Sequence, residues 1–511
     1  MQTICTYTNI WLTAQKIIIE ADTNKALPTI DIIGLPDASI KEAKERIRGT
    51  FRNCELEIPR KKIVLNLAPS DTKKVGTRFD LPMAIAILLL TQDWNIKHNE
   101  IISQAVFFWE LSLDWSLREV DWLLPSVLAA RQDGYKHFFI PQNNVEELCY
   151  IPDIILHPYA SFGQLADACI SGTALHVHTQ KNYAIQHKRQ TTDSFDDIKW
   201  HNSTKRALSI AVAWMHNVLL IGAPWSGKTM LAKSIQSLLP PLDFDQSMEV
   251  SQIYSVMWML NKQQPMIYQR PFRQVHHTAS KVSIIWWGRN LTPGEVSLAH
   301  LGILLFDEIA EFPKDVLEVL RQPIEDNYVT ISRVSWSVRY PADFMFVATM
   351  NPCKCWYHKD TERQCTCSIQ HIKRYQSTLS WPLLDRFDMI LEIPRENINV
   401  LLSEKSSDSN NTLYTSIEQA RSIQKKRYEN TDISINTNIS AKNIQTYIPL
   451  QEKEKAFLET ASKKLLLSSR VIHRLIKVAR TIADIDNQPH VTINHLAEAM
   501  QYRAKSMLIE Q

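Results

Sequence analysis

The residues with the clearest chemical pattern occupy positions 222–229 and match G-x-x-x-x-G-K-[ST]. An apolar segment that predicts a buried strand precedes them, and a segment that predicts a helix follows, as a phosphate-binding loop requires. Backbone amides and the helix N-terminus surround phosphate oxygens in such a loop. Lys228 is expected to reach the β- and γ-phosphates, and the Thr229 hydroxyl to ligate Mg²⁺. The pattern predicts binding of ATP and Mg²⁺ by Gly222, Ala223, Pro224, Trp225, Ser226, Gly227, Lys228 and Thr229.

Trp225 does not suit this loop. The backbone must fold tightly against phosphate here, which favours glycine because it has no Cβ, and an indole would fill the nucleotide's space. The chain has only 11 Gly beside 14 Trp, whereas Gly alone usually supplies about 7% of residues. Many tryptophans lie in turn-like settings that favour Gly. We hypothesise that most are glycine in the living protein, through a UGA codon read as Gly; a Trp-rich recognition surface would not explain Trp225.

Two adjacent acids end another apolar segment. Gly-Ile-Leu-Leu-Phe at 302–306 predicts a buried strand, and Asp307 and Glu308 follow it. Asp307 is expected to hold Mg²⁺ through its water shell, and Glu308 to polarise the attacking water. Surface acids after a buried strand would be common in isolation. Together with the phosphate loop, however, the pair predicts hydrolysis of the bound triphosphate.

Three further polar residues are positioned for the same reaction. Asn351 ends a short apolar strand and is a candidate to hold the water near the γ-phosphate, although an Asn-Pro pair is often only a turn. Arg386 could stabilise charge in the transition state, from a neighbouring subunit. Arg470 opens a helix, where a lid could touch phosphate. For each arginine the alternative is a surface ion pair.

Four of the eight cysteines are clustered as two C-x-C pairs, within 15 residues. Four thiolates this close suit tetrahedral Zn²⁺, and the ion would hold together a loop that projects from the core. Because the spacing differs from the common C-x₂-C, free thiols remain an equal alternative. The possible zinc ligands are Cys353, Cys355, Cys365 and Cys367.

Composition and periodicity predict an α/β protein with several domains. The net charge of +3 indicates no overall electrostatic field for nucleic acid. No apolar segment reaches the length of a membrane span, and the N-terminus lacks a signal-peptide pattern, so a cytoplasmic protein with no membrane partner is expected. We predict an α/β domain over residues 1–185, an ATPase core over 195–394, a polar flexible break over 403–411, and an all-α lid over 412–511.

Along nearly its whole length the chain resembles the YifB/ComM family of magnesium-chelatase-like AAA+ ATPases. The stretches that carry the resemblance include Asn-Leu-Ala-Pro (66–69), Phe-Asp-Leu-Pro (79–82), Glu-Leu-Ser-Leu-Asp (110–114), Pro-Gly-Glu-x-Ser-Leu-Ala-His (293–300), Leu-Arg-Gln-Pro (320–323) and Asn-Pro-Cys (351–353). At most tryptophan positions, including Trp214, Trp225 and Trp356, the family pattern has Gly. This difference supports the recoding hypothesis independently of composition.

The resemblance implies a Lon-protease-like N-terminal domain, an AAA+ P-loop core with chelatase-type insertions, and a C-terminal helical lid. It also implies a ring, usually a homo-hexamer, with ATP at subunit interfaces. In that ring Arg386 looks like the arginine finger, Asn351 like sensor 1 and Arg470 like sensor 2. Members of the ComM type are DNA helicases that promote branch migration when incoming DNA is recombined.

Three functions compete on this basis. The first is an ATP-driven motor that acts on DNA. The second is a chelatase-like ATPase subunit that remodels a protein partner, although chelatase subunits of this size class lack the N-terminal domain. The third is an ATP-dependent protease, which needs a Ser nucleophile and a Lys base. The corresponding stretch, Arg-Phe-Asp-Leu-Pro-Met at 78–83, has no serine, which disfavours proteolysis.

Overall fold

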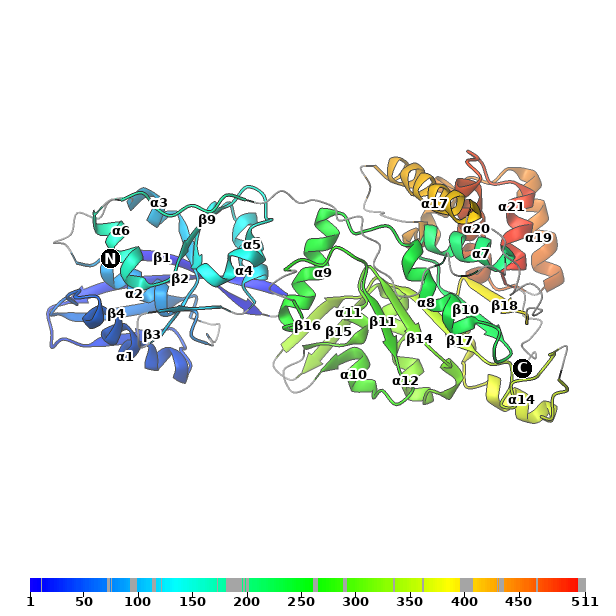
Figure 1. The fold of residues 1–511 in the computed structure, drawn as a ribbon, viewed down its shortest axis with the longest axis horizontal. Coiled ribbons are helices and arrows are strands. Elements are labelled where there is room, and N and C mark those ends of the chain that lie inside the picture. The colour runs from blue at the N-terminus through cyan, green and yellow to red at the C-terminus, as the bar shows by residue number, and fades with distance from the viewer. Residues whose placement is uncertain are drawn as a thin grey trace. The chain divides into compact units, whose positions relative to one another are not determined.

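A computed structural model gives the fold of the chain. It describes residues 1–10, 12–70, 74, 76–91, 99–112, 116–120, 122–171, 173–180, 195, 198, 202–260, 265–287, 292–333, 336–360, 363–395, 408–429, 431, 436–465 and 467–503. The chain divides into two compact units. The first comprises Met1–Ile185 with Ser247–Ile267, and the second comprises Gln186–Gln246 with Tyr268–Gln511 (Figure 1).

The first unit is built on a mixed seven-stranded sheet in the order β3-β4-β2-β1-β5-β8-β9. These strands are β1 (Gln2–Ile10), β2 (Thr13–Asn24), β3 (Ile30–Ile33), β4 (Lys62–Ala68), β5 (Ala105–Phe107), β8 (His137–Pro141) and β9 (Ile155–Tyr159). A two-stranded sheet pairs β6 (Glu110–Leu111) with β7 (Leu117–Arg118). The helices are α1 (Ala38–Asn53), α2 (Asp80–Leu88), α3 (Asn99–Ser103), α4 (Leu123–Gln132), α5 (Val145–Leu148) and α6 (Phe162–Ser171).

Local sequence explains the helices that cover this sheet. Asp37 caps α1 by accepting a hydrogen bond from the Ile40 amide at 2.8 Å, and Ile40, Ala43 and Ile47 form its buried apolar face. The apolar helix α2 is buried along its whole length. Its Asp80 carboxylate pairs with Arg46 of α1 at 2.7 Å, so an ion pair occupies the stretch that lacks the protease serine.

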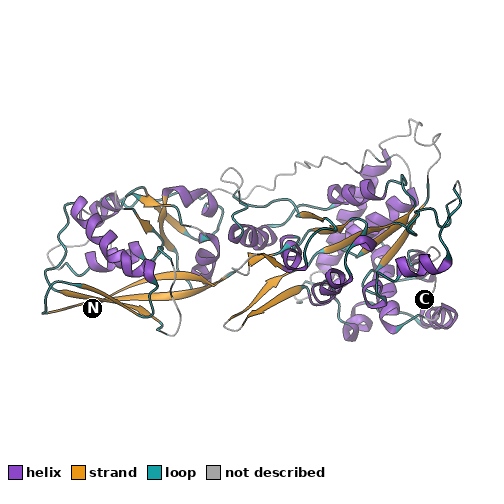
Figure 2. Cartoon of the chain, turned by 90° about the horizontal axis from the view of Figure 1, so that it is seen from below, coloured by secondary structure: helices purple, strands orange, loops and turns teal. Residues whose placement is uncertain are grey.

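The second unit contains a parallel five-stranded sheet in the order β11-β14-β17-β10-β18. Its strands are β11 (Phe272–Val275), β14 (Ile303–Phe306), β17 (Met345–Met350), β10 (Val218–Gly222) and β18 (Met389–Ile393). The three strands β10, β14 and β17 are apolar at nearly every position and fully buried, as expected when helices pack around a parallel sheet (Figure 2). The carboxyl ends of β10, β14 and β17 therefore present their following residues along one edge.

Two β-hairpins interrupt the connections between these strands. One pairs β12 (Trp286–Trp287) with β13 (Thr292–Pro293), and the other pairs β15 (Tyr328–Arg333) with β16 (Trp336–Pro341). The helices of this region are α7 (Asn202–Ala213), α8 (Lys228–Leu238), α10 (Lys281–Ile285), α11 (Glu295–Leu298), α12 (Lys314–Val319), α13 (Arg321–Asp326), α14 (Ile369–Gln376) and α15 (Trp381–Leu384). Most of α9 (Phe244–Val256) belongs to the first unit.

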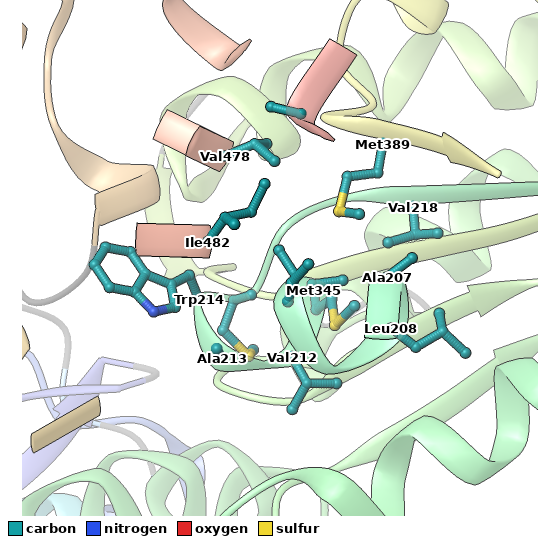
Figure 3. Close-up of a cluster of buried hydrophobic side chains, with 14 of the residues drawn as sticks. Ala207, Leu208, Val212, Ala213, Trp214, Val218, Met345, Met389, Val478 and Ile482 are labelled. Atoms are coloured by element: carbon teal, nitrogen blue, oxygen red, sulfur yellow. The ribbon is translucent and has the colours of Figure 1, made fainter. Parts of the chain in front are cut away.

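The C-terminal part of the second unit is helical, as predicted. It comprises α17 (Asp408–Arg427), α18 (Ile444–Tyr447), α19 (Glu452–Leu465), α20 (Ser469–Ile485) and α21 (Ile493–Gln501). Buried side chains of α20, including Val478 and Ile482, join a cluster with α7 and the parallel sheet (Figure 3). Trp214, which follows α7, is fully buried in the same cluster. The helical region and the sheet thus share one hydrophobic core.

The predicted polar break over 403–411 is wrong in its second half, because α17 already begins at Asp408. No Gly or Pro lies between Asp408 and Arg427 to stop the helix, and the buried Tyr414, Ile417 and Ala420 anchor it to the core. Residues 403–407 lie outside the described residues. The three-domain boundaries proposed from sequence remain a prediction.

The predicted fold class is confirmed: the chain is a mixed α/β protein with a parallel sheet and a helical C-terminal region. Among the residues that the structure describes, no helix combines the length and the apolar character needed to cross a membrane.

Candidate nucleotide site

The phosphate loop joins β10 to α8, as its pattern predicts. Gly222 is required at the start of the loop, because a Cβ there would lie 2.5 Å from the Ile393 carbonyl oxygen of β18. Gly227 caps α8 with a left-handed φ of 80°, which favours glycine. The Ser226 hydroxyl donates to the Ala223 carbonyl at 2.8 Å. These contacts hold the loop in a tight turn at the N-terminus of α8, where an anion is favoured.

Trp225 lies at the exposed tip of this loop. Its backbone has a left-handed φ of 65°, and 93% of its surface is exposed to solvent. A bulky residue rarely adopts this conformation, which costs about 1–2 kcal/mol. The expectation that this position suits glycine is therefore supported by the backbone.

Lys228 points back toward the loop that precedes it. Its ammonium donates hydrogen bonds to the carbonyl oxygens of Gly222 at 2.8 Å and Ala223 at 2.7 Å. Burial lowers the pKa of Lys228 to about 8, while the nearby carboxylates of Asp307 and Glu308 act in the opposite direction. The amine is thus held inside the loop, where phosphate oxygens would replace the two carbonyl groups as acceptors.

This lysine predicts a pH dependence of nucleotide affinity. Bound phosphate favours the charged amine, so above about pH 8 binding must take up a proton. The affinity for MgATP should then fall by up to about tenfold per pH unit. Equilibrium binding between about pH 7 and pH 10 measures the effect. Lys228→Arg is the control, because its guanidinium stays charged. Parallel profiles for wild type and Lys228→Arg would contradict this assignment.

The predicted magnesium ligands, Thr229 and Asp307, lie close together. The Thr229 hydroxyl lies 3.2 Å and 3.3 Å from the two carboxylate oxygens of Asp307. Asp307 directly follows β14, and Thr229 lies in the first turn of α8. A hydroxyl and a carboxylate are oxygen donors of the kind that Mg²⁺ prefers. The residues present therefore fit a magnesium ion beside the phosphate loop.

Thr349 is a member of this site that the sequence analysis missed. Its hydroxyl, near the end of β17, donates to Asp307 and accepts a hydrogen bond from the Glu308 amide at 2.9 Å. It fixes both acids relative to the neighbouring strand. An alternation signal could not have found it, because every residue of β17 is buried.

Glu308 and Asn351 are also brought together. The Asn351 amide nitrogen lies 3.4 Å from a carboxylate oxygen of Glu308. Glu308 has a left-handed φ of 54°, a strained conformation for a residue with a side chain. The structure therefore brings together the two residues that the sequence suggests for a water molecule at the γ-phosphate.

Arg386 and Arg470 converge on one carboxylate, that of Glu325 in α13. Arg386 forms an ion pair with Glu325, and Arg470 lies 3.3 Å from its other oxygen. Arg386 is buried and also donates to the Arg321 carbonyl at 3.1 Å. Burial lowers the pKa of Arg386, whereas Glu325 raises it. The structure thus shows both arginines in ion pairs, the alternative that the sequence left open, and adds Glu325, which no short motif identifies.

A buried ionic network joins the helical region to the sheet. Asp388, just before β18, pairs with Arg474 of α20 and accepts from the Asn217 amide at 3.0 Å. His216 lies 3.3 Å from Asp388 and 2.8 Å from the Thr481 hydroxyl of α20. Burial alone would raise the pKa of Asp388, but Arg474 and His216 hold it well below its usual range. The helix that carries Arg470 is thereby fixed to the strand that follows Arg386.

The four clustered cysteines come together as the sequence predicts. The sulfur atoms of Cys353, Cys355, Cys365 and Cys367 all lie within 4.8 Å of one another. They belong to the segment that follows β17, two residues beyond Asn351. Four sulfur atoms this close together fit a single metal ion.

Three family models match consecutive parts of the chain. The model described as "Magnesium chelatase, subunit ChlI" matches residues 194–401. "Subunit ChlI of Mg-chelatase" matches residues 19–144, and "Magnesium chelatase, subunit ChlI C-terminal" matches residues 407–503.

Curated relatives match over nearly the full length. "Competence protein ComM" of Haemophilus influenzae is 35% identical over 504 residues, which cover 98% of this chain and 96% of the relative. "Uncharacterized protein YifB" of Escherichia coli is 35% identical over 504 residues, covering 97% and 96%. "Magnesium-chelatase subunit ChlI homolog" of Methanocaldococcus jannaschii is 19% identical over 218 residues, covering 41% of this chain and 51% of the homologue.

The matched chelatase regions coincide with the described sheets and the helical C-terminus. Identity of 35% over 98% of the chain places it with proteins of its own length rather than with the shorter region shared with the archaeal homologue. The chain therefore belongs to the YifB/ComM family of magnesium-chelatase-like AAA+ ATPases.

Proposed function

We propose that this ATPase forms a homo-hexameric ring in the cytoplasm and drives branch migration of DNA during recombination of incoming strands. The observation that carries the proposal is the convergence of Lys228, Thr229, Asp307 and Glu308 at one sheet edge. The family resemblance and a relative described as a competence protein support DNA as the substrate.

Within each subunit, different residues bind the phosphates, bind the magnesium ion and activate the water. Lys228 binds the β- and γ-phosphates, while Thr229 and Asp307 hold Mg²⁺, which neutralises phosphate charge when bound. Glu308 accepts a proton from the attacking water, and Asn351 orients that water. The 3.4 Å contact between Asn351 and Glu308 supports this pairing. Thr349 keeps Asp307 and Glu308 in place.

The arginines support a site completed by a second subunit. Among the described residues, Arg386 contacts Glu325 and the carbonyls of Arg321 and Pro382, and Arg470 contacts Glu325. These partners lie outside the phosphate loop of the same chain. In the proposed ring, Arg386 serves as arginine finger and Arg470 as sensor 2, stabilising charge on the transferred phosphate.

The β15–β16 hairpin supplies the proposed contact with DNA. Arg339 is exposed, and its guanidinium lies 3.4 Å from the centre of the Tyr328 ring on the paired strand. A cation beside an aromatic ring can bind a phosphate and stack on a base without reading sequence. This suits a motor that must move along any DNA.

A branch-migration assay on synthetic four-way DNA tests the proposal. The Trp225→Gly protein should move the junction with ATP and fail with a non-hydrolysable analogue. Lys228→Ala should abolish both nucleotide binding and movement. ATP hydrolysis without movement or DNA binding would reject DNA as the substrate.

A hairpin variant tests the DNA contact itself. Arg339→Ala should weaken DNA binding by about 1 kcal/mol or more, since it removes a phosphate contact and a stacking partner. Fluorescence anisotropy with labelled single strands measures this affinity. Thr330→Ala is the matched control, because Thr330 is exposed and pairs with Arg339 across the same hairpin. Equal loss in both variants would contradict a specific role for Arg339.

A second function remains supported by the family models, all three of which describe a magnesium-chelatase subunit. In this alternative the ring remodels a protein partner. DNA distinguishes the two functions: ATP hydrolysis by a DNA motor should rise when DNA is added, whereas that of a protein-remodelling subunit should not respond to it.

A further inference from the structure

The segment from Cys353 to Cys367, here the cysteine loop, has the geometry of a metal site. The sulfur atoms of Cys353 and Cys355 are 3.4 Å apart, those of Cys353 and Cys365 3.8 Å, and those of Cys355 and Cys365 3.4 Å. Sulfurs that bind one tetrahedral zinc at about 2.3 Å lie about 3.8 Å from each other. A disulfide requires about 2.05 Å, and all four cysteines are free. The spacing therefore matches ligands that share an ion.

The backbone around the first pair is also shaped for metal binding. The Trp356 amide closes a tight turn by donating to the Cys353 carbonyl at 3.0 Å, and amides of Tyr357 and Thr366 donate to the Cys355 sulfur. Hydrogen bonds of this kind orient and stabilise thiolate ligands. Cys353 itself is fully buried. Four thiolates so close together would repel one another strongly without a cation between them.

The cysteine loop connects to the nucleotide site at two points. Asn351 lies two residues before it, and the Pro352 carbonyl between them accepts a hydrogen bond from the Gln376 side chain at 2.8 Å. On its other side, the buried Asp360 carboxylate lies 3.5 Å from Arg395, which in turn donates to the Pro224 carbonyl of the phosphate loop at 3.4 Å. The cysteine loop is thus joined to the proposed water-orienting residue through Pro352 and to the phosphate loop through Arg395.

We propose that Cys353, Cys355, Cys365 and Cys367 bind one Zn²⁺, and that this zinc positions Asn351 and Pro224 for ATP. The zinc is structural, because four protein ligands leave no open position for catalysis. Its effect on ATP rests on the proposed hydrolytic function, whereas its binding does not. Loss of the metal should release both anchors of the cysteine loop at once.

Metal analysis of the full-length wild-type protein is the first test. One zinc per chain, with cobalt-substituted protein showing the absorption bands of tetrahedral tetrathiolate coordination, is the expected result. Cys365→Ser with Cys367→Ser should lose the zinc, while the control Cys54→Ser, a half-buried thiol of the first unit, should keep it. Clearly substoichiometric zinc in wild-type protein grown with added zinc would overturn the proposal.

The coupling is tested by a variant that keeps every thiol. Asp360→Asn should retain zinc yet bind MgATP several-fold more weakly, because its link through Arg395 to Pro224 is lost. Asp315→Asn, an exposed acid of α12, is the control. Unchanged MgATP affinity after chelation of the zinc would refute the coupling. Zinc-loaded protein that binds ATP but never hydrolyses it would refute the motor function instead.

The tryptophans carry a second and independent inference. Four of them have left-handed backbone conformations: Trp122 at φ 56°, Trp225 at 65°, Trp258 at 59° and Trp356 at 76°. Such a conformation is strained for a residue with a side chain but costs almost nothing for glycine. Among the residues that the structure describes, the indole nitrogens of Trp109 and Trp214 are buried and have no hydrogen-bond partner, although buried Trp usually finds one.

We infer that residues 122, 225, 258 and 356 are glycine in the protein that the cell makes, because the cell reads UGA codons as glycine. The left-handed turns would then not be strained. The phosphate loop and the tight turn at position 356 would each have glycine at a position that favours it. Peptide mass spectrometry of protein from the source organism should find glycine at 122, 225, 258 and 356. Tryptophan at these positions would overturn the inference.

A recombinant comparison gives a second measurement. Trp225→Gly should bind MgATP several-fold more tightly than the tryptophan form, because it removes an indole from the loop that surrounds the phosphates. Relief of the backbone strain should raise stability as well, since this strain is present without nucleotide. Trp258→Gly, a left-handed position in the first unit, should raise stability without changing that affinity. Equal affinity in the two variants would count against glycine as the functional residue at 225.

Discussion

Glu308→Gln should stop ATP turnover while leaving ATP bound. Glutamine keeps the size of the side chain and can still meet Asn351, which lies 3.4 Å from the wild-type carboxylate, but it cannot accept a proton from water. Loss of a general base lowers the rate by about 10²–10⁴-fold. We expect steady-state hydrolysis to fall by this factor and the equilibrium affinity for MgATP to stay near the wild-type value.

Glu311→Gln is the matched control, since this acid is exposed and lies three residues further along the chain. It should hydrolyse ATP at the wild-type rate. Turnover by Glu308→Gln close to that of wild type would remove Glu308 from the reaction. Weak MgATP binding by the same variant would instead assign Glu308 to binding rather than to proton transfer.

Asp388→Asn should strongly lower the free energy of unfolding. It leaves Arg474 and His216 facing a neutral group in a buried site, and breaking a buried ion pair costs about 3–5 kcal/mol. Urea unfolding at neutral pH measures the free energy of unfolding. Asp326→Asn, an exposed acid of α13, should change it by less than about 0.5 kcal/mol.

The pH dependence of this difference follows from the pKa of Asp388, which is held below its usual range in the folded state. The stabilisation is therefore complete above the unfolded-state value of about 4 and is lost progressively as the pH falls below it. The stability gap between wild type and Asp388→Asn should stay constant above about pH 5 and narrow in acid. A gap that widens on acidification would contradict the proposed charge state.

Short local patterns predicted the parts of the site that lie within one stretch of chain. The phosphate loop, the adjacent acids and the cysteine pairs each depend on spacing over a few residues, and the structure places all of them where that spacing implies. Helices α1, α19 and α20 follow from apolar periodicity in the same way. The periodicity of apolar residues and the local spacing of motif residues can be read from a sequence directly.

Other members of the site depend on contacts between distant elements. Thr349 sits in a strand whose every residue is buried, so nothing local marks its hydroxyl as a partner of Asp307. Glu325 and Arg395 act through residues that are distant along the chain. The start of α17 at Asp408 was missed because a polar composition resembles a linker until the packing of Tyr414 and Ile417 is known.

The strand order β11-β14-β17-β10-β18 has a consequence for variation within the family. The β12–β13 hairpin lies in the connection before β14, and the β15–β16 hairpin lies in the connection after it. The lengths of both hairpins can therefore change without shifting the register of any strand in the sheet. In the proposed motor, hydrolysis and substrate contact are therefore carried by separate parts of the chain. Exchanging a hairpin between relatives should redirect what the ATPase acts on while its chemistry is inherited unaltered.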